Sequence, residues 1–179
     1  MTSPVDHAAP AWRRPRTPLP HPHGRLLIVT LLSVVIADQL SKACVRLWIT
    51  PGEVVALLGP VLSLTNATNR GIAWGMLSGS ELRLPFMTAV SLLMFVVLSA
   101  WYRRLQPDER PLAITLALLL AGGTGNFIDR LLYREVTDFI ALHLVVPWPV
   151  FNLADVAITV GIALFATELV RRPPVPEPS

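Results

Sequence analysis

The chain has 179 residues, of which 53% are hydrophobic and 15% are charged, and its formal net charge is +3. This apolar share exceeds the roughly 45–50% of ordinary soluble domains, so the composition predicts one membrane-embedded domain. Apart from Lys42, all 15 basic residues are arginines and they gather at the ends of apolar runs, which excludes a continuous basic face for nucleic acid.

Residues 1–24 contain six prolines and the cluster Arg13, Arg14 and Arg16, without apolar periodicity. We therefore expect a disordered cytoplasmic leader. The apolar run after Arg25 lacks a small-residue cleavage site and is too long for a cleavable signal peptide, so it is predicted to be a retained span.

A helix that crosses a bilayer needs roughly 20 mainly apolar residues. Four stretches meet this need, at about 26–49, 84–102, 111–128 and 151–170. The second and third carry no charge, whereas the first and fourth carry polar and charged residues: Asp38, Gln39, Ser41 and Lys42 in the first, and Asn152, Asp155 and Glu168 in the fourth. Residues 25–172 are thus predicted to form a four-helix membrane domain, followed by a cytoplasmic tail at 173–179.

Arginine and lysine counts beside the spans predict the orientation. Nine lie on the side of both termini and five on the other, so both termini are expected to be cytoplasmic. On the outer side, residues 50–83 should form a small β-hairpin around Gly59-Pro60. Residues 137–148 should form a short interfacial helix that begins at Asp138 and ends at Pro147, with Trp148 at headgroup depth.

Several polar residues fall at one depth, near the outer ends of the spans. Asp155 lies about 6 Å below the outer end of the fourth span, at a helical rise of ~1.5 Å per residue. Asp38 and Lys42 share one face of the first span because they are four residues apart. Placing an ionisable side chain in lipid costs roughly 2.5–3.5 kcal/mol of free energy, so such residues usually have a function. Several of them at one depth therefore predict a functional site. Alternatively, Asp38–Lys42 and Asp155–Arg130 are ion pairs that only join helices. Three asparagines in the same layer favour a site, because they add more acceptors than packing requires: Asn69, Asn126 and Asn152.

The residue types restrict the chemistry. No HExxH motif occurs and three of the four histidines lie in the leader, so neither a metal nor a cofactor is expected, and His143 is interpreted as an interfacial polar residue. No GxSxG motif indicates a serine nucleophile, and Cys44 in an apolar run is interpreted as a small hydrophobic residue. Paired carboxylates remain, and one of two close aspartates keeps its proton while the other acts as a base. Asp138 and Asp155 are the best-placed pair, although a helix cap and an ion pair are their simpler roles.

Five sequence blocks in order resemble the lipoprotein signal peptidase family: DQLSK at 38–42, NRGIAWG at 69–75, GGTGNFIDRL at 122–131, VTDF at 136–139 and FNLADVAI at 151–158. The resemblance implies an aspartyl protease of the bacterial cytoplasmic membrane, which removes the signal peptide from prolipoproteins before a diacylglyceryl-modified cysteine. It implies a membrane all-α fold, a four-transmembrane-helix bundle with a small extracytoplasmic β-sheet cradle and an interfacial helix. The expected partners are the prolipoprotein and membrane lipids, with the chain as a monomer.

The resemblance also implies residue roles. Asp138 and Asp155 would be the catalytic dyad near the outer face. Nine further residues would support the dyad or line the substrate groove: Asp38, Lys42, Asn69, Gly71, Asn126, Asp129, Arg130, Asn152 and Ala154. Two positions depart from the family pattern. Arg134 stands where many members have Gly, so a different backbone path is expected for the turn before Asp138, and Trp74 stands where Phe is common.

Two other classes of protein remain open. A small transporter or proton-conducting helix bundle would need polar residues that continue to the cytoplasmic face, but the inner halves of the spans are nearly free of them, apart from Glu168. A non-catalytic scaffold would not need so many Asn and Asp residues, because small residues join membrane helices equally well.

Overall fold

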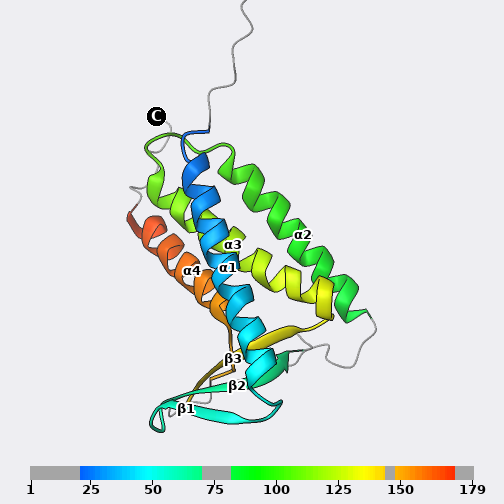
Figure 1. The fold of residues 1–179 in the computed structure, drawn as a ribbon. Coiled ribbons are helices and arrows are strands. Elements are labelled where there is room, and N and C mark those ends of the chain that lie inside the picture. Colours follow the sequence, from blue (N-terminus) through cyan, green and yellow to red (C-terminus); the bar gives the residue numbers. More distant parts are fainter. Residues whose placement is uncertain (1–20, 70–81, 144–147, 172–179) are drawn as a thin grey trace, which may run out of the picture.

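The computed structural model describes residues 21–69, 82–143 and 148–171 (Figure 1). Outside the described residues lie residues 1–20 of the expected leader, the expected site residue Gly71, Trp74 and Pro147. The elements in chain order are α1 Gly24–Trp48, β1 Val54–Leu58, β2 Leu62–Asn69, α2 Arg83–Tyr102, α3 Arg110–Tyr133, β3 Val136–Leu142 and α4 Leu153–Arg171.

The four helices are each long and apolar enough to cross a membrane, which confirms the predicted four-helix bundle. Helix α3 is the centre of the bundle, because 56% of its apolar window is buried, whereas none of the window of α2 is. Figure 1 shows α3 between α2 on one side and α1 and α4 on the other. The lipid-facing surface of α2 is apolar, with Leu93 and Val96 exposed, as membrane helices require.

Glycines allow α3 to approach its neighbours closely. A Cβ at Gly122 would collide with the carbonyl oxygen of Ala154 in α4, and a Cβ at Gly125 would lie 2.6 Å from Asp38 Oδ2 in α1. Small residues at such positions are typical of membrane helix interfaces. Gly125 therefore leaves room for a carboxylate between two helices.

Helix α3 continues to Tyr133, five residues beyond the predicted end at 128. It continues because Asp129 is buried against partners within the protein instead of facing water. The helix ends at Arg134, whose φ of 61° and ψ of 10° place it in the left-handed region. The turn thus takes the conformation that glycine usually adopts after a helix, although an arginine occupies it.

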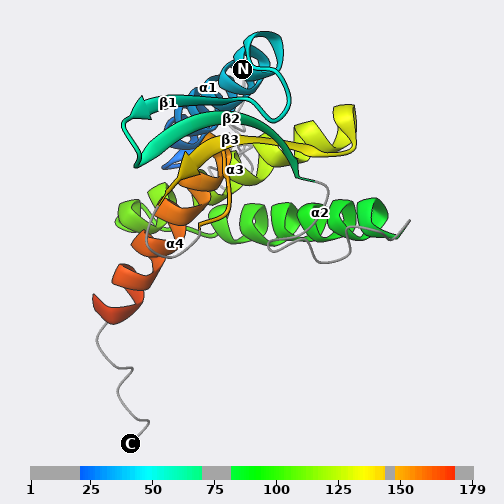
Figure 2. The ribbon, with the colours of Figure 1, turned by 90° about the horizontal axis from the view of Figure 1, so that it is seen from below.

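The strands form one antiparallel sheet in the order β1-β2-β3. Figures 1 and 2 show the sheet at the end of the bundle where α1 ends and α4 begins. The hairpin predicted for residues 50–83 is confirmed as β1 and β2, which are joined by a turn at Gly59 with a φ of 50°. Strand β1 is exposed along its whole length.

The interfacial helix predicted to begin at Asp138 is wrong, because this segment is strand β3. Two neighbours supply partners for its backbone. Strand β2 pairs with one side, while Phe139 N and Ile140 N both donate to Phe151 O, at 2.9 and 2.8 Å. Between α3 and α4, no helix occurs in the described residues 134–143 and 148–152. Asp138 is accordingly not a helix cap but an interior residue of a strand.

Candidate active site

A buried ion cluster joins α1 to α3. Lys42 Nζ lies 2.8 Å from Asp38 Oδ2 and 3.3 Å from Asp129 Oδ2, and all three side chains are fully buried. The expected Asp38–Lys42 ion pair is therefore formed, with Asp129 as a third member. Gln39 Nε2 lies between the two carboxylates, 3.1 Å from Asp38 Oδ2 and 3.2 Å from Asp129 Oδ1.

Each carboxylate of the cluster also holds one segment that carries an aspartate of the predicted dyad. Asp38 Oδ1 accepts a hydrogen bond from Ala154 N at 2.9 Å, in the first turn of α4, where backbone N–H groups lack partners within the helix. Asp129 Oδ2 accepts one from Thr137 N at 3.0 Å, in β3. The cluster thus fixes the start of α4 and the start of β3 relative to α1 and α3.

Two asparagines connect the cluster to the dyad. Asn126 Oδ1 accepts hydrogen bonds from Lys42 Nζ at 3.0 Å and from Asn152 Nδ2 at 3.1 Å. A lysine ammonium can only donate, so Asn126 must turn its oxygen toward Lys42. Its Nδ2 then faces Asp155 and donates to Oδ1 at 2.8 Å. Because Asn126 presents its oxygen to Asn152, Asn152 must present its Nδ2 in return. This nitrogen also donates to Asp138 Oδ1 at 2.6 Å.

Asp155 lies in the first turn of α4, and Asn152 immediately precedes the helix. Asp155 N donates to Asn152 Oδ1 at 3.0 Å, and Asn152 N donates to Asp155 Oδ2 at 3.2 Å. This reciprocal arrangement is a capping box, and a carboxylate there also interacts favourably with the helix dipole. The role of Asp155 in starting α4 sets the direction of its side chain.

Asp138 is only 3% exposed. Its Oδ2 accepts a hydrogen bond from Asn69 Nδ2 at 3.0 Å. The pKa of Asp138 is raised from 3.8 to about 6, chiefly by burial; the charge of Asp155 also raises it, while the hydrogen bonds from Asn69 and Asn152 and the charge of Lys42 lower it. Both aspartates contact Asn152, so the structure brings the two predicted members of the dyad to one asparagine.

Arg130 does not form the ion pair with Asp155 that was the alternative expectation. In the described part of the chain its guanidinium makes no ion pair within 4.0 Å, and its NH1 donates to Asn126 O at 3.3 Å, within α3. The charge of Arg130 is half-buried beside the dyad. His143 lies apart from this site, where its Nε2 is 2.8 Å from Ser63 Oγ in the sheet.

Among residues 21–69, 82–143 and 148–171, no group of three His, Cys, Asp or Glu side chains is placed to hold a metal ion. The described site is instead built from carboxylates, amides and one ammonium group. Such a set can share a proton between carboxylates and can donate hydrogen bonds to them.

Sequence reasoning missed three residues of this region: Gln39, Arg46 and Thr137. Arg46 was counted only among the five basic residues of the outer side, although its spacing of four from Lys42 places both on one face of α1. The part of Thr137 that binds Asp129 is a backbone amide, which the sequence does not reveal. Gln39 was noted as polar but had no assigned partner.

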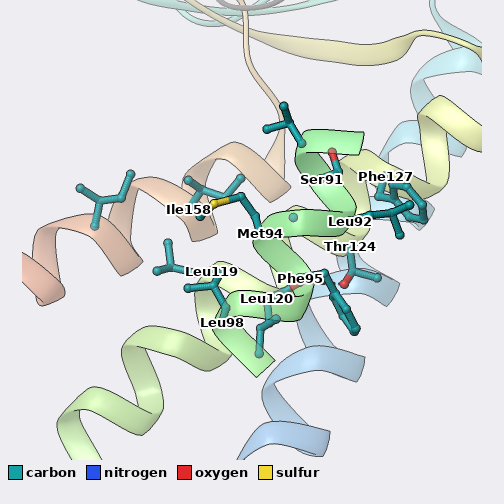
Figure 3. Close-up of a pocket in the computed structure, with 13 residues that line it drawn as sticks. Ser91, Leu92, Met94, Phe95, Leu98, Leu119, Leu120, Thr124, Phe127 and Ile158 are labelled. Atoms are coloured by element: carbon teal, nitrogen blue, oxygen red, sulfur yellow. Dashed lines mark hydrogen bonds between the residues drawn. The ribbon is translucent and has the colours of Figure 1, made fainter. Parts of the chain in front are cut away.

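An apolar cavity of about 560 Å³ lies between α2, α3 and α4 (Figure 3). Among the described residues that line it, only Ser91 and Thr124 carry hydroxyl groups, and large apolar side chains such as Leu92, Phe95, Phe127 and Ile158 form most of the lining. Phe127 follows Asn126 directly, and Ile158 lies three residues after Asp155. The helices that carry two site residues therefore also form walls of the cavity.

The fold and site define a polytopic membrane protein with two aspartates held by asparagines at the sheet end of a four-helix bundle. Residues 30–171 match the family model described as signal peptidase (SPase) II. This match covers most of the chain, so the chain belongs to the signal peptidase II family, whose members are peptidases.

Relatives of similar length support the same family assignment. The chain is 37% identical over 145 residues to the lipoprotein signal peptidase of Geobacter metallireducens, covering 80% of this chain and 89% of the relative. It is 38% identical over 153 residues to that of Pseudomonas aeruginosa, covering 83% and 90%. A solved bacterial membrane enzyme superposes with a TM-score of 0.77 at 30% identity, covering 82% of this chain and 88% of that one.

Proposed function

We propose that this peptidase is an aspartyl endopeptidase that removes the signal peptide from prolipoproteins, cutting before a cysteine that carries diacylglycerol. The observation that carries the proposal is the convergence of Asp138 and Asp155 on Asn152. The printed names of the relatives support the substrate class, because they are lipoprotein signal peptidases.

In the proposed reaction the two aspartates share one proton. One carboxylate takes a proton from water as the water attacks the scissile carbonyl, while the other donates its proton to the carbonyl oxygen. When the C–N bond breaks, the first aspartate passes the proton taken from water to the departing amine, and the second takes a proton back from the gem-diol hydroxyl, which restores the dyad. Because the two groups are coupled, they titrate as one unit. No cofactor is needed for this chemistry.

The supporting residues then act on the dyad. Asn126 and Asn152 donate to its carboxylates and fix their directions. Asp38, Lys42 and Asp129 fix the two asparagines and the segments that carry the dyad. Asn69 also donates to Asp138, and Ala154 N attaches the start of α4 to Asp38. Gly71 and Arg130 would line the substrate groove.

The apolar cavity between α2, α3 and α4 supports a lateral route for the substrate. Its apolar lining suits side chains of the signal helix, and burial contributes about 25 cal/mol per Å² of apolar surface. The diacylglyceryl chains would stay in the lipid. We place the chain in the bacterial inner membrane as a monomer, with both termini in the cytoplasm and the dyad near the outer face.

The interior of α3 argues against the alternative of a proton-conducting bundle. The buried residues of its first half are apolar apart from Thr115, and Thr115 Oγ1 donates to Pro111 O in the same helix. A proton path would need a file of polar groups here. This stretch offers one hydroxyl group, already bonded to its own helix.

Cleavage of a defined precursor tests the proposal. Purified chain in detergent micelles should release the signal peptide from a diacylated prolipoprotein and leave the unmodified precursor intact. Asp138→Asn and Asp155→Asn should each lower kcat at least about a thousandfold, the size of a lost general acid or base. Asp108→Asn, the same change in an exposed loop, is the control. Normal cleavage by either dyad variant would overturn the dyad, and equal cleavage of the unmodified precursor would overturn the substrate.

A further inference from the structure

Arg46, in the last turn of α1, makes three contacts that link α1, α3 and β3. Its NH1 donates to Thr137 Oγ1 at 2.8 Å and lies 3.8 Å from Asp129 Oδ1. Its guanidinium carbon lies 4.3 Å from the centre of the Tyr133 ring, in the geometry of a cation–π contact. Arg46 does not touch either aspartate of the dyad, yet Thr137 is the residue immediately before Asp138.

Thr137 is held at two points. Its backbone N donates to Asp129, and its side chain accepts from Arg46. Successive side chains of a strand point to opposite faces. The side chain of Thr137 therefore faces Arg46 while that of Asp138 faces Asn152. A contact that holds the Thr137 side chain also sets the rotation of the strand, and so the direction of the Asp138 carboxylate.

The pairing of β3 with β2 is irregular next to Asp138. The register shifts between Leu64, which is opposite Ile140, and Ala67, which is opposite Asp138. Such a bulge interrupts the ladder and increases the local twist. A slip by one residue would turn every side chain of the strand to the other face. Only in the observed register does a hydroxyl group meet Arg46.

We propose that Arg46 is a positioning residue, which fixes the register of β3 through Thr137 and so directs the Asp138 carboxylate toward Asn152. The inference rests on the proposed role of Asp138 in catalysis. Arg46 takes no part in the chemistry itself. Its effect should therefore appear in the rate of the chemical step and should pass through the Thr137 hydroxyl group.

Kinetics of four variants of the full chain, in micelles with the diacylated precursor, test this. Arg46→Met and Thr137→Val should each lower kcat about tenfold, the equivalent of one hydrogen bond to a charged group, and leave KM unchanged. Thr137→Ser, which keeps the hydroxyl group, should retain near-parental kcat. The Arg46→Met/Thr137→Val double variant should be no slower than the slower single variant, because both remove the same contact.

Thr68→Val is the matched control, because Thr68 lies opposite Thr137 in β2 and is exposed. It should leave kcat unchanged. Thermal unfolding of each variant confirms that rates are measured on folded protein. Additive losses in the double variant, or equal losses in Thr137→Ser and Thr137→Val, would overturn the positioning role. Comparing the parent with Asp138→Asn distinguishes a failure of the positioning role of Arg46 from a failure of the proposed function. If the parent cleaves the precursor and Asp138→Asn does not, the proposed function stands, whatever the rate of Arg46→Met.

Discussion

At the scale of single residues, the site depends on the direction of two side-chain amides. Asn126 and Asn152 each have an oxygen and a nitrogen that could exchange places, and Lys42 decides between them because it can only donate. The result is that amide nitrogens, rather than oxygens, face Asp138 and Asp155. Hydrogen bonds from these nitrogens make it possible to keep two carboxylates in one poorly hydrated place.

The raised pKa of Asp138 has a consequence for stability. The folded protein binds a proton at this group more tightly than the unfolded chain does, because the pKa rises from 3.8 to about 6. The contribution of Asp138 to the free energy of unfolding should then fall as pH rises from about 4 to about 6, by up to about 3 kcal/mol, and stay level above that.

Asp138→Asn removes this titration. The free energy of unfolding of the variant minus that of the parent should increase with pH over the same interval, whatever its absolute value. Denaturation in micelles at a series of pH values measures it. Asp108→Asn, at an exposed site, should show no such increase. A difference that is constant between pH 4 and pH 6 would mean that Asp138 is not held in the buried, unfavourable environment described.

At the scale of elements, the turn between α3 and β3 carries a conformational cost. Arg134 has a φ of 61°, and a residue with a Cβ is disfavoured there. The strain is tolerated because the turn must deliver Thr137 to Asp129, and Asp138 beyond it to Asn152. The sequence departure at Arg134 therefore changes the energy of the turn while the left-handed conformation is kept.

Arg134→Gly should stabilise the protein by about 1 kcal/mol, since glycine adopts this conformation without strain. Arg103 gives a matched control, because it also follows a helix but has a φ of −63° and a ψ of −18°. There the change to glycine should destabilise by about 0.5–1 kcal/mol. Thermal unfolding of both variants in micelles is the measurement. A less stable Arg134→Gly variant would show that the arginine side chain contributes more than the strain removes.

The elements differ in how well the sequence predicts them. The four spans follow from apolar length, because a bilayer imposes it, and the site aspartates stand out as charges in or beside apolar runs. Strand β3 was predicted as a helix, because a short apolar segment has ambiguous periodicity. Its actual partners, β2 and Phe151, are chosen by tertiary contacts. Arg46 was missed for a different reason: its face on α1 was visible, but its partner in β3 was not.

At the scale of the whole molecule, one ion cluster holds together elements that lipid alone would not join. Apolar helix faces interact with lipid about as well as with each other, so polar contacts and close packing select the arrangement. Lys42 ties α1 to α3 through Asp129, and Asp38 ties α1 to the start of α4. The cluster is thus a structural foundation of the bundle as well as a support for the site.

Lys42→Met should destabilise the bundle by about 3–5 kcal/mol, because it leaves two buried carboxylates without their ammonium partner. Adding Asp38→Asn should restore part of this loss, since one of the unpaired charges is removed. Thr115→Val is the control that tests whether removing any buried polar group destabilises the bundle this much. The Thr115 hydroxyl is also fully buried but bonds within α3, so the free energy of unfolding should fall by less than about 1 kcal/mol. The free energy of unfolding of all three variants in micelles is the measurement. If Lys42→Met were as stable as Thr115→Val, the helices would be held by packing alone, and the cluster would serve only to orient the amides of the site.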